Sequence, residues 1–316
     1  MTPMSTCVLG IDAGATKTVC ALGDSSGRAI GMARTEGTNL QTTPRTILVE
    51  RLRSVVAEAL ALSPGVTPGA VCLGVAGADR DTDFSAIRTI VTSLGLRIPT
   101  VVVNDALIAL VAGVGDAPGI VIVAGTGSIT YGRNASNRAA RAGGWGYILG
   151  DEGSGYWLGR RALRAVVREL DGRGPSTRLT PRILTHFGIT SATELIGRIQ
   201  GTELRPAMIA ALASHVHEAF TESDVVAARI LDSAARELSA SAGAVVRRLG
   251  LRDAPFTCVL AGTIFRAMPS LVDALSAALA RDAPHAEVSR LVKEPAEGAL
   301  HLAAAALVGD VALPRY

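Results

Sequence analysis

The sequence is poor in aromatic side chains, which make up 3% of its 316 residues. It has only four cysteines and no C-x-x-C pair, so it predicts neither a disulfide framework nor a cysteine-bound metal cluster. No stretch reaches the roughly 18 apolar residues of a membrane-spanning helix, and Asp12 interrupts the first apolar run too early for a secretion signal. These absences predict a globular, cytoplasmic protein whose cores are packed mainly by aliphatic side chains.

Lysine is also scarce, because it occurs only at Lys17 and Lys293, and the net charge of +3 is carried almost entirely by arginine. The arginines are scattered, so no basic face is predicted to follow a nucleic-acid backbone. His215 and His217 stand two residues apart on a helical segment and point to different faces, which argues against a metal pair. All five histidines are interpreted as surface or packing residues.

Two apolar strands each run into a short turn of small and hydroxyl-bearing residues. They cover residues 8–18 and 120–128, and a repeated element of this kind is typical of a duplicated module. Small residues let backbone N–H groups approach phosphate oxygens, Thr and Ser add hydroxyl donors, and Lys17 adds a point charge. A β-hairpin also favours glycine at such a turn, so one turn alone would be weak support. The pair predicts a nucleotide ligand.

The predicted order of elements repeats once along the chain. The first copy has three strands within 7–36, followed by a helix over 44–62, a strand over 70–76, a helix over 83–94, a strand over 99–103 and a helix over 105–113. The second copy has strands over 119–124, 128–133 and 138–142, a largely helical stretch over 155–249, a strand over 256–261 and a helix over 264–281.

This order predicts two α/β domains with a cleft between them, and a helical insertion in the second. The expected domains are residues 1–116 and residues 117–295. A final Ala-rich helix over 296–308 begins just after Pro295, so the segment 296–316 is expected to pack on the first domain.

A carboxylate follows directly after the strand at 99–103, where an α/β sheet presents its catalytic groups. Asp105 is therefore a candidate general base. Asn and Asp are also favoured as caps at the start of a helix, so an N-cap for the following helix is the alternative interpretation. One residue can have both roles.

Both tryptophans lie in one glycine-rich segment, residues 143–159. A sugar presents apolar C–H faces and many hydroxyls, so its site requires an aromatic platform, exposed backbone amides and a carboxylate. Gly144, Trp145 and Asp151 fit this description. The alternative for Asp151 is a charged first turn of the next helix. Trp157, inside that helix, is expected in the core.

With these motifs the chain resembles the N-acetylglucosamine kinases, within the BadF/BadG/BcrA/BcrD-type ATPases of the actin, chaperone-ATPase and hexokinase superfamily. The family's D-G-G-x-T-K-T motif is similar to residues 12–18, its A-G-T-G-S motif to 124–128, and its G-G-W-G-x-x-x-G-D-E-G-S loop to 143–154. The resemblance covers nearly the whole chain. It implies duplicated ribonuclease H-like domains of the actin-like ATPase type.

The resemblance also implies residue roles. The residues that would bind ATP are Asp12, Gly14, Thr16, Lys17, Thr126, Gly127, Ser128, Gly262, Thr263 and Arg266, and Asp12 would bind Mg²⁺ through water. The residues that would hold the sugar are Asn39, Asp105, Gly144, Trp145 and Asp151, with Asp105 as the catalytic base. Ala13 and Thr263 replace glycines of the family pattern, and the second change leaves the adenine contacts open.

These features predict transfer of the γ-phosphoryl group of ATP to the 6-hydroxyl of an amino sugar. N-acetylglucosamine is the first choice, with glucosamine and N-acetylmuramic acid as alternatives. A 2-hydroxyacyl-CoA dehydratase activator would need closely placed cysteines, which the chain lacks, and a nucleotide-binding module without turnover is the third class. The expected partner is the small-molecule sugar, without nucleic acid or membrane, and a homodimer is left open.

Overall fold

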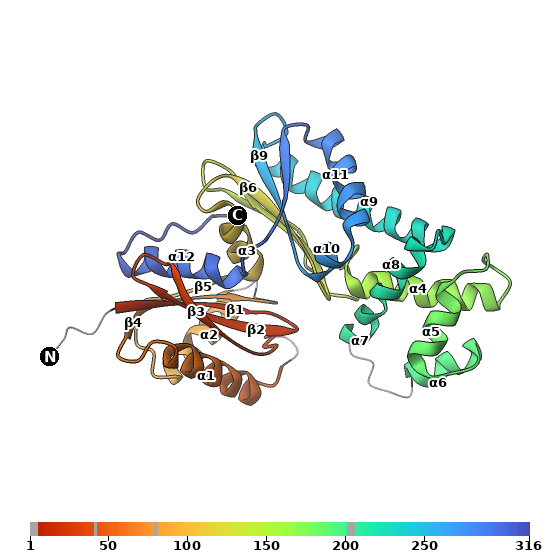
Figure 1. The fold of residues 1–316 in the computed structure, drawn as a ribbon. Coiled ribbons are helices and arrows are strands. Elements are labelled where there is room, and N and C mark those ends of the chain that lie inside the picture. The colour runs from red at the N-terminus through yellow and green to blue at the C-terminus, as the bar shows by residue number, and fades with distance from the viewer. Residues whose placement is uncertain (1–5, 41–42, 79–80, 201–205) are drawn as a thin grey trace. The chain divides into compact units, whose positions relative to one another are not determined.

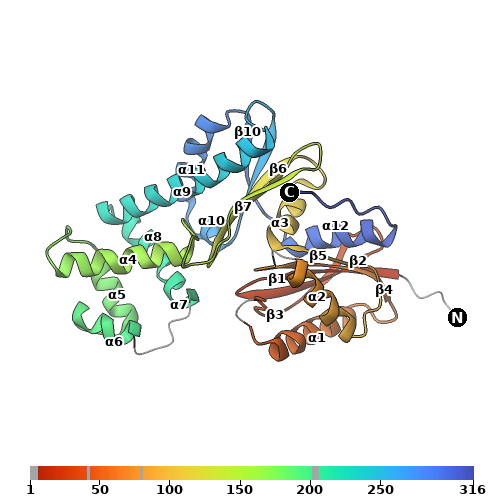
Figure 2. The same cartoon turned by 180° about the vertical axis from the view of Figure 1, so that it is seen from behind.

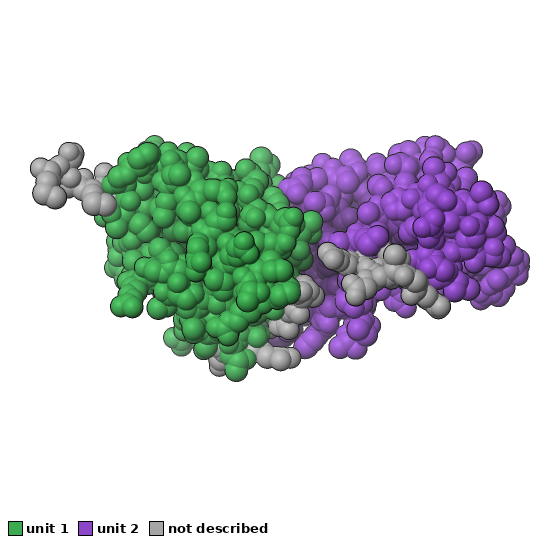
Figure 3. Space-filling model, turned by 90° about the horizontal axis from the view of Figure 1, so that it is seen from below, with its two compact units in different colours: residues 1–121, 131–140, 291–316 green, residues 122–130, 141–290 purple. Residues whose placement is uncertain are grey.

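The computed structural model describes residues 6–40, 43–78, 81–200 and 206–316 (Figure 1). The chain divides into two compact units, which Figure 3 colours separately. Unit 1 comprises residues 1–121, 131–140 and 291–316, and unit 2 comprises residues 122–130 and 141–290.

The first half of the chain forms a five-stranded sheet with the strand order β3-β2-β1-β4-β5. Strand β1 is antiparallel to β2 and parallel to β4, and β4 is parallel to β5. Its elements in chain order are β1 (Thr6–Ala13), β2 (Lys17–Asp24), β3 (Ala29–Glu36), α1 (Arg45–Ala61), β4 (Thr67–Val75), α2 (Asp81–Ser93), β5 (Thr100–Asn104) and α3 (Asp105–Val114).

Helices cover both faces of this first sheet, α1 and α2 on one side and α3 and α12 (Pro295–Leu307) on the other (Figures 1 and 2). Successive side chains of β1 alternate between the two faces. Leu9 and Ile11 join the core cluster that contains Leu48 of α1 and Ile87 of α2. Burial on both faces explains why β1 reads as a continuous apolar run rather than an alternating pattern.

Glycines let α12 lie directly against the sheet and against α3. A Cβ atom added at Gly10 of β1 would be 2.4 Å from the carbonyl oxygen of Ala296, and one added at Gly298 would be 2.0 Å from the carbonyl oxygen of Ile108. Neither position has room for a side chain. The Ala-rich composition of α12 thus serves close packing, with its first turn fixed at Pro295.

The second half of the chain repeats the same arrangement of strands. Its sheet has the order β10-β9-β6-β7-β8. Read in the opposite direction, β8-β7-β6-β9-β10 corresponds strand by strand to β3-β2-β1-β4-β5 of the first sheet. The predicted duplication is therefore confirmed. The elements are β6 (Gly119–Ala124), β7 (Ser128–Arg133), β8 (Ala139–Gly143), α4 (Gly155–Leu170), α5 (Leu179–Phe187), the 3₁₀ helix η1 (Ala192–Glu194), α6 (Leu195–Gln200), α7 (Pro206–Ala211), α8 (Ala213–Thr221), α9 (Val225–Leu249), β9 (Phe256–Ala261), α10 (Thr263–Ala267), α11 (Pro269–Asp282) and β10 (Ala286–Arg290).

The structure differs from the predicted elements at two places in this half. The single helix predicted over 264–281 is two helices, α10 and α11, because Pro269 cannot continue a helix but fits the first turn of a new one. Strand β10 was not predicted. It lies at the sheet edge with most of its residues exposed or half-buried, so it lacks the apolar pattern that would reveal a strand.

Helix α4 is amphipathic. Trp157, Leu158, Leu163 and Val166 are buried, while the arginines Arg160, Arg161, Arg164 and Arg168 are exposed. Leu170 is 51% exposed, because it is the last residue of the helix. All four cysteines are buried and unpaired, as expected of small core residues. Within the described part of the chain, no helix has both the length and the apolarity needed to cross a membrane.

Candidate active site

The carboxylates of Asp12 and Asp105 lie at the same edge of the first sheet. Asp12 of β1 is in register with Gly74 of β4, and Gly74 is in register with Val103 of β5, two residues before Asp105. The three strands are parallel, so their carboxyl ends meet at this edge, where α/β sheets bind ligands. The structure therefore brings the predicted metal-binding residue and the predicted base together in unit 1.

The pKa of Asp12 is raised to about 7, mainly by burial and also by the negative charges of Asp105 and Glu294, while Lys17 acts to lower it. A buried carboxylate in this setting favours any ligand that adds positive charge beside it. Carboxylate oxygens are ligands that Mg²⁺ accepts, usually together with several waters and substrate phosphates. Among the residues described, no group of three or more His, Cys, Asp or Glu could hold a metal alone. Asp12 fits a role as one protein ligand of a nucleotide-bound ion.

Capping does not explain Asp105. The N-cap of α3 is Asn104, whose side chain accepts a hydrogen bond from the N–H of Ala106 at 2.9 Å. Asp105 is the first residue of the helix and is half-buried. The alternative interpretation of Asp105 as an N-cap was therefore wrong.

The first predicted phosphate turn joins β1 to β2. The N–H of Gly14 donates to the carbonyl of Lys17 at 3.1 Å, and a Cβ atom at Gly14 would lie 2.9 Å from that same carbonyl oxygen. Thr16 is exposed at the tip of the turn. The turn has the tight, small-residue geometry that the sequence predicted.

The ammonium group of Lys17 contacts a carboxylate that the sequence analysis missed. It donates to both carboxylate oxygens of Glu294, the N-cap residue of α12, and Arg34 also contacts Glu294 at 3.3 Å. No local sequence pattern connects residue 17 with residue 294. Only the packing of α12 on the first sheet reveals the pair.

Unit 2 holds the second predicted phosphate turn, between β6 and β7. The N–H of Gly125 donates to the carbonyl of Gly127 at 2.9 Å, and the carbonyl of Thr126 accepts from Tyr156 at 3.2 Å. The hydroxyl of Ser128 donates to the carbonyl of Glu152 at 2.8 Å. These bonds tie the turn to the start of α4, whose N-cap is Ser154.

Asp151 lies against this second turn. Its carboxylate accepts from the backbone N–H of Ser128 at 3.1 Å, and a Cβ atom at Gly127 would be 2.8 Å from Oδ2 of Asp151. The pKa of Asp151 is raised overall, because burial and the negative charge of Glu152 outweigh the hydrogen bond from Ser128, which lowers it. Asp151 also has a positive φ of 60°, uncommon for a residue other than glycine. A predicted sugar residue and a predicted phosphate turn thus touch within unit 2.

The predicted sugar loop is fixed at its base and exposed at its tip. The N–H of Gly144 donates to the carbonyl of Ser128 at 3.0 Å, and the positive φ of 74° at Gly144 favours glycine there. Trp145 is 64% exposed, and the guanidinium of Arg141 lies 5.0 Å from the centre of its ring. The indole is thus presented on the surface of unit 2 with a cation beside it.

Gly262 lies directly against the backbone of β6. Its φ is 106°, and a Cβ atom there would be 2.2 Å from the carbonyl oxygen of Ala124. Thr263 and Arg266 follow on α10 with exposed side chains. The local geometry therefore requires glycine at position 262.

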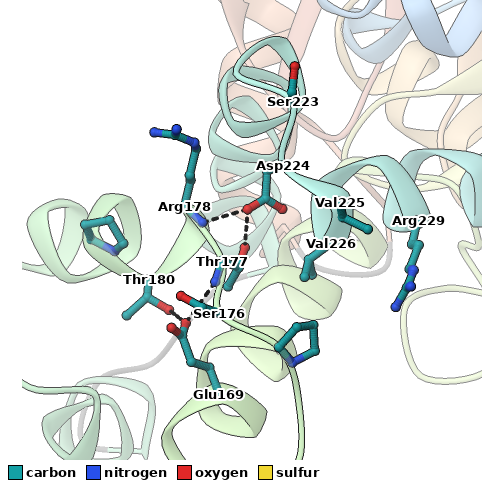
Figure 4. A pocket seen from close by; sticks show the side chains of 12 residues that line it. Glu169, Ser176, Thr177, Arg178, Thr180, Ser223, Asp224, Val225, Val226 and Arg229 are labelled. Carbon is teal, nitrogen blue, oxygen red and sulfur yellow. Dashed lines mark hydrogen bonds between the residues drawn. The ribbon is translucent and has the colours of Figure 1, made fainter.

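A cavity of about 910 Å³ lies in the helical insertion, away from every motif residue (Figure 4). Its polar side chains bond to one another. Asp224 accepts from the hydroxyl of Thr177 at 3.0 Å and from the N–H of Arg178 at 2.7 Å, and Glu169 accepts from the N–H of Thr177 at 3.3 Å. These bonds join the start of α9 to the segment before α5, so the cavity is explained by packing of the insertion and is assigned no chemistry.

Comparison with known proteins found a family model and relatives that match nearly the whole chain. A family model described as the BadF/BadG/BcrA/BcrD ATPase family matches residues 9–303. An N-acetylmuramic acid/N-acetylglucosamine kinase of Clostridium acetobutylicum is 35% identical, over 94% of this chain and 97% of the relative. An N-acetyl-D-glucosamine kinase of Dictyostelium discoideum is 32% identical, over 93% of this chain and 97% of the relative.

A solved structure from Chromobacterium violaceum, provisionally named an N-acetylglucosamine kinase, matches with a TM-score of 0.75 at 26% identity. The match covers 94% of this chain and 99% of that one. The likeness over nearly the full length of both chains, together with the two sheets of matching strand order, confirms the expected duplicated actin-like ATPase fold.

Proposed function

Because the chain belongs to the BadF/BadG/BcrA/BcrD ATPase family, we propose that it transfers the γ-phosphoryl group of ATP to the 6-hydroxyl of N-acetylglucosamine. Both curated relatives carry N-acetylglucosamine kinase in their names, and one name also includes N-acetylmuramic acid. The chain is an amino-sugar kinase. N-acetylglucosamine is the substrate common to both relatives, so N-acetylmuramic acid and glucosamine stay alternatives to be tested.

The observation that carries the proposal is the position of Asp105 beside Asp12, at the carboxyl ends of β5 and β1. Phosphoryl transfer needs an acceptor hydroxyl aimed at the γ-phosphorus and a group that takes its proton. In this proposal the Asp105 carboxylate accepts that proton while it orients the hydroxyl. The negative charge of Asp105 beside Asp12 also strengthens the attraction of this edge for a cation.

The remaining residues position the two substrates. We assign Thr16, Lys17, Thr126 and Gly127 to the phosphates, through hydroxyls, the Lys17 ammonium and backbone N–H groups. Gly14 and Ser128, whose N–H groups bond within their own units, would shape the two phosphate turns. Mg²⁺ bound with ATP would neutralise charge on the phosphates, and Asp12 is the residue that would hold it. Most of the rate enhancement then comes from alignment and electrostatic stabilisation rather than covalent chemistry.

The sugar and adenine contacts complete the assignment. The sugar is assigned to Asn39, Asp105, Gly144, Trp145 and Asp151, and the adenosine to Gly262 with Thr263 and Arg266. The division into residues 1–116 with 296–316, and residues 117–295, is our proposal for the two functional domains. A homodimer is a further state that this proposal leaves open.

A panel of sugars in an ATP-coupled assay tests the function. We expect turnover with N-acetylglucosamine, and a loss of about 10²–10⁴-fold in Asp105→Asn, with ATP binding retained. Asp253→Asn is the matched control, because Asp253 is exposed and lies outside every motif. Turnover that Asp105→Asn leaves unaltered would contradict the assignment, and a protein that binds ATP but phosphorylates no sugar would favour the nucleotide-binding module.

A further inference from the structure

A buried pair of hydroxyls joins the predicted phosphate turn to the segment that carries the predicted sugar residue Asn39. The side-chain oxygens of Thr18 and Thr38 are 2.7 Å apart, and both residues are completely buried. Thr18 is in β2 directly after the turn, and Thr38 directly precedes Asn39. A hydroxyl pair shielded from water in this way holds its two segments in one arrangement.

The backbone makes the same connection. The N–H of Thr38 donates to the carbonyl of Gly14 at 3.0 Å, so the segment is bonded to the turn itself. A Cβ atom at Gly37 would lie 2.2 Å from the carbonyl oxygen of Ala15, which means that residue 37 packs directly on the peptide at the tip of the turn. The link therefore consists of a backbone bond, a side-chain bond and a close van der Waals contact.

We infer that Thr38 is a positioning residue, which fixes the acceptor sugar held by Asn39 relative to the phosphate turn at Gly14. The inference rests on the proposed function, because it takes Asn39 as a sugar contact and the turn as a phosphate contact. Thr38 touches neither substrate in this role. It acts by setting the separation between the two binding segments.

The physical basis is the sensitivity of phosphoryl transfer to alignment. The attacking oxygen, the phosphorus and the leaving oxygen lie roughly in line in the transition state. A misplacement of about 1 Å in such a reaction can lower the rate on the order of 100-fold. A loosened link would therefore affect the catalytic step more than the binding of either substrate alone.

A purely structural role predicts a different pattern. Removing one hydroxyl leaves its buried partner without a hydrogen bond, which destabilises the fold, whereas replacing both partners by apolar groups of similar shape is nearly neutral. If Thr38 only stabilised the protein, the double replacement would restore activity together with stability. If Thr38 positions Asn39, activity would stay low after stability has recovered.

The experiment compares Thr38→Val, Thr38→Ser and the double variant Thr18→Val/Thr38→Val with the wild type, using N-acetylglucosamine and ATP. The matched control is Thr89→Val, the same chemical change at an exposed threonine of α2. The readouts are kcat, both KM values, the melting temperature, and the ratio of sugar phosphorylation to ATP hydrolysis without sugar.

We expect Thr38→Val to lower kcat by about 10–100-fold, with a smaller change in either KM and a fall in the transfer-to-hydrolysis ratio. Thr38→Ser should keep kcat within about threefold of the wild type, because it retains the hydroxyl. The double variant should regain the melting temperature but not kcat. If kcat recovers with the melting temperature, or never falls in Thr38→Val, the inference is overturned. A wild type that phosphorylates no amino sugar would instead overturn the proposed function.

Discussion

The ammonium group of Lys17 lies 2.8 Å from one carboxylate oxygen of Glu294 and 3.0 Å from the other, although 277 residues separate the two in the chain. Burial alone would raise the pKa of Glu294, but the bonds from Lys17 and Arg34 lower it, so this carboxylate is ionised at neutral pH. Both side chains remain partly exposed, at 43% and 25%, and pairs of this kind contribute about 0–1 kcal/mol to stability. The pair therefore matters mainly because it places the negative charge of Glu294 beside a predicted phosphate turn.

Glu294→Gln should strengthen ATP binding. The carboxylate repels a triphosphate and competes with it for Lys17, so its removal is expected to lower the Kd for ATP by about 2–10-fold at low salt, and less at high salt. Titration calorimetry at two salt concentrations measures the effect. Glu287→Gln, at an exposed position of β10, is the control. Weaker ATP binding by Glu294→Gln would show that the carboxylate instead holds Lys17 in its working position.

Asp12→Asn should make the protein more stable and inactive. The pKa of Asp12 rises from its ordinary 3.8 to about 7 in the folded state. Between these values the folded protein binds more protons than the unfolded chain, so stability falls as the pH rises from about 4 to about 7. Asp12→Asn has no carboxyl group to ionise at this position, so it does not lose stability in this way. Above pH 7 it should be more stable than the wild type by on the order of 4 kcal/mol, because one pKa unit corresponds to about 1.36 kcal/mol.

Urea unfolding from pH 4 to pH 8 checks this prediction, with the sugar kinase assay run on the same samples. Asp253→Asn, at an exposed site, should follow the wild-type curve. Parallel curves for Asp12→Asn and the wild type would mean that the Asp12 carboxylate is not desolvated in the folded protein.

Gly262→Ala should be much more damaging than Gly250→Ala. Both glycines have a positive φ, of 106° and 67°. A side chain at Gly262 would collide with the backbone of Ala124, whereas nothing lies within 4 Å of a Cβ atom at Gly250. Gly250→Ala is expected to cost about 1–2 kcal/mol from backbone strain alone. Gly262→Ala should cost clearly more and weaken ATP binding, as measured by urea unfolding and calorimetry. Equal losses in the two variants would refute the close approach.

Much of the fold could be predicted because its central strands are buried on both faces. The apolar runs that became β1, β4 and β6 stand out in the sequence, and each is bounded by a turn of small or polar residues. Edge strand β10 carries no such signal, because exposed positions do not select apolar residues. The break between α10 and α11 was signalled by Pro269, which the sequence analysis did not use.

The candidate site could be predicted only where its residues are neighbours in the chain. The motif at 143–154 predicted the loop that carries Trp145 and Asp151, but not that Asp151 would accept a bond from Ser128. The contacts of Thr18 with Thr38, and of Lys17 with Glu294, join segments that only the folded sheet brings together. Pairwise contacts of this kind leave no pattern in a single sequence.

A histidine pair in the helical insertion gives a last prediction, of opposite sign to that for Asp12. Nε2 of His215 lies 3.1 Å from Nδ1 of His186, and Nδ1 of His215 lies 3.2 Å from Oε2 of Glu218, which Arg182 also contacts at 3.6 Å. A hydrogen bond between the two rings requires that at least one ring nitrogen carries no proton. Burial lowers the pKa of His186, and His215 lowers it further.

The folded-state pKa of His186 therefore lies below its unfolded value of 6.5. Its contribution to stability is present above pH 6.5 and is lost as the pH falls through the folded-state pKa. His186→Gln should remove this acid-sensitive contribution, and His285→Gln, at an exposed site, should not. Because Asp12 changes stability in the opposite direction over part of the same range, both histidine variants are compared in the Asp12→Asn background by urea unfolding from pH 5 to pH 8. A His186→Gln curve parallel to that of the background would mean that the ring-to-ring bond is absent in solution.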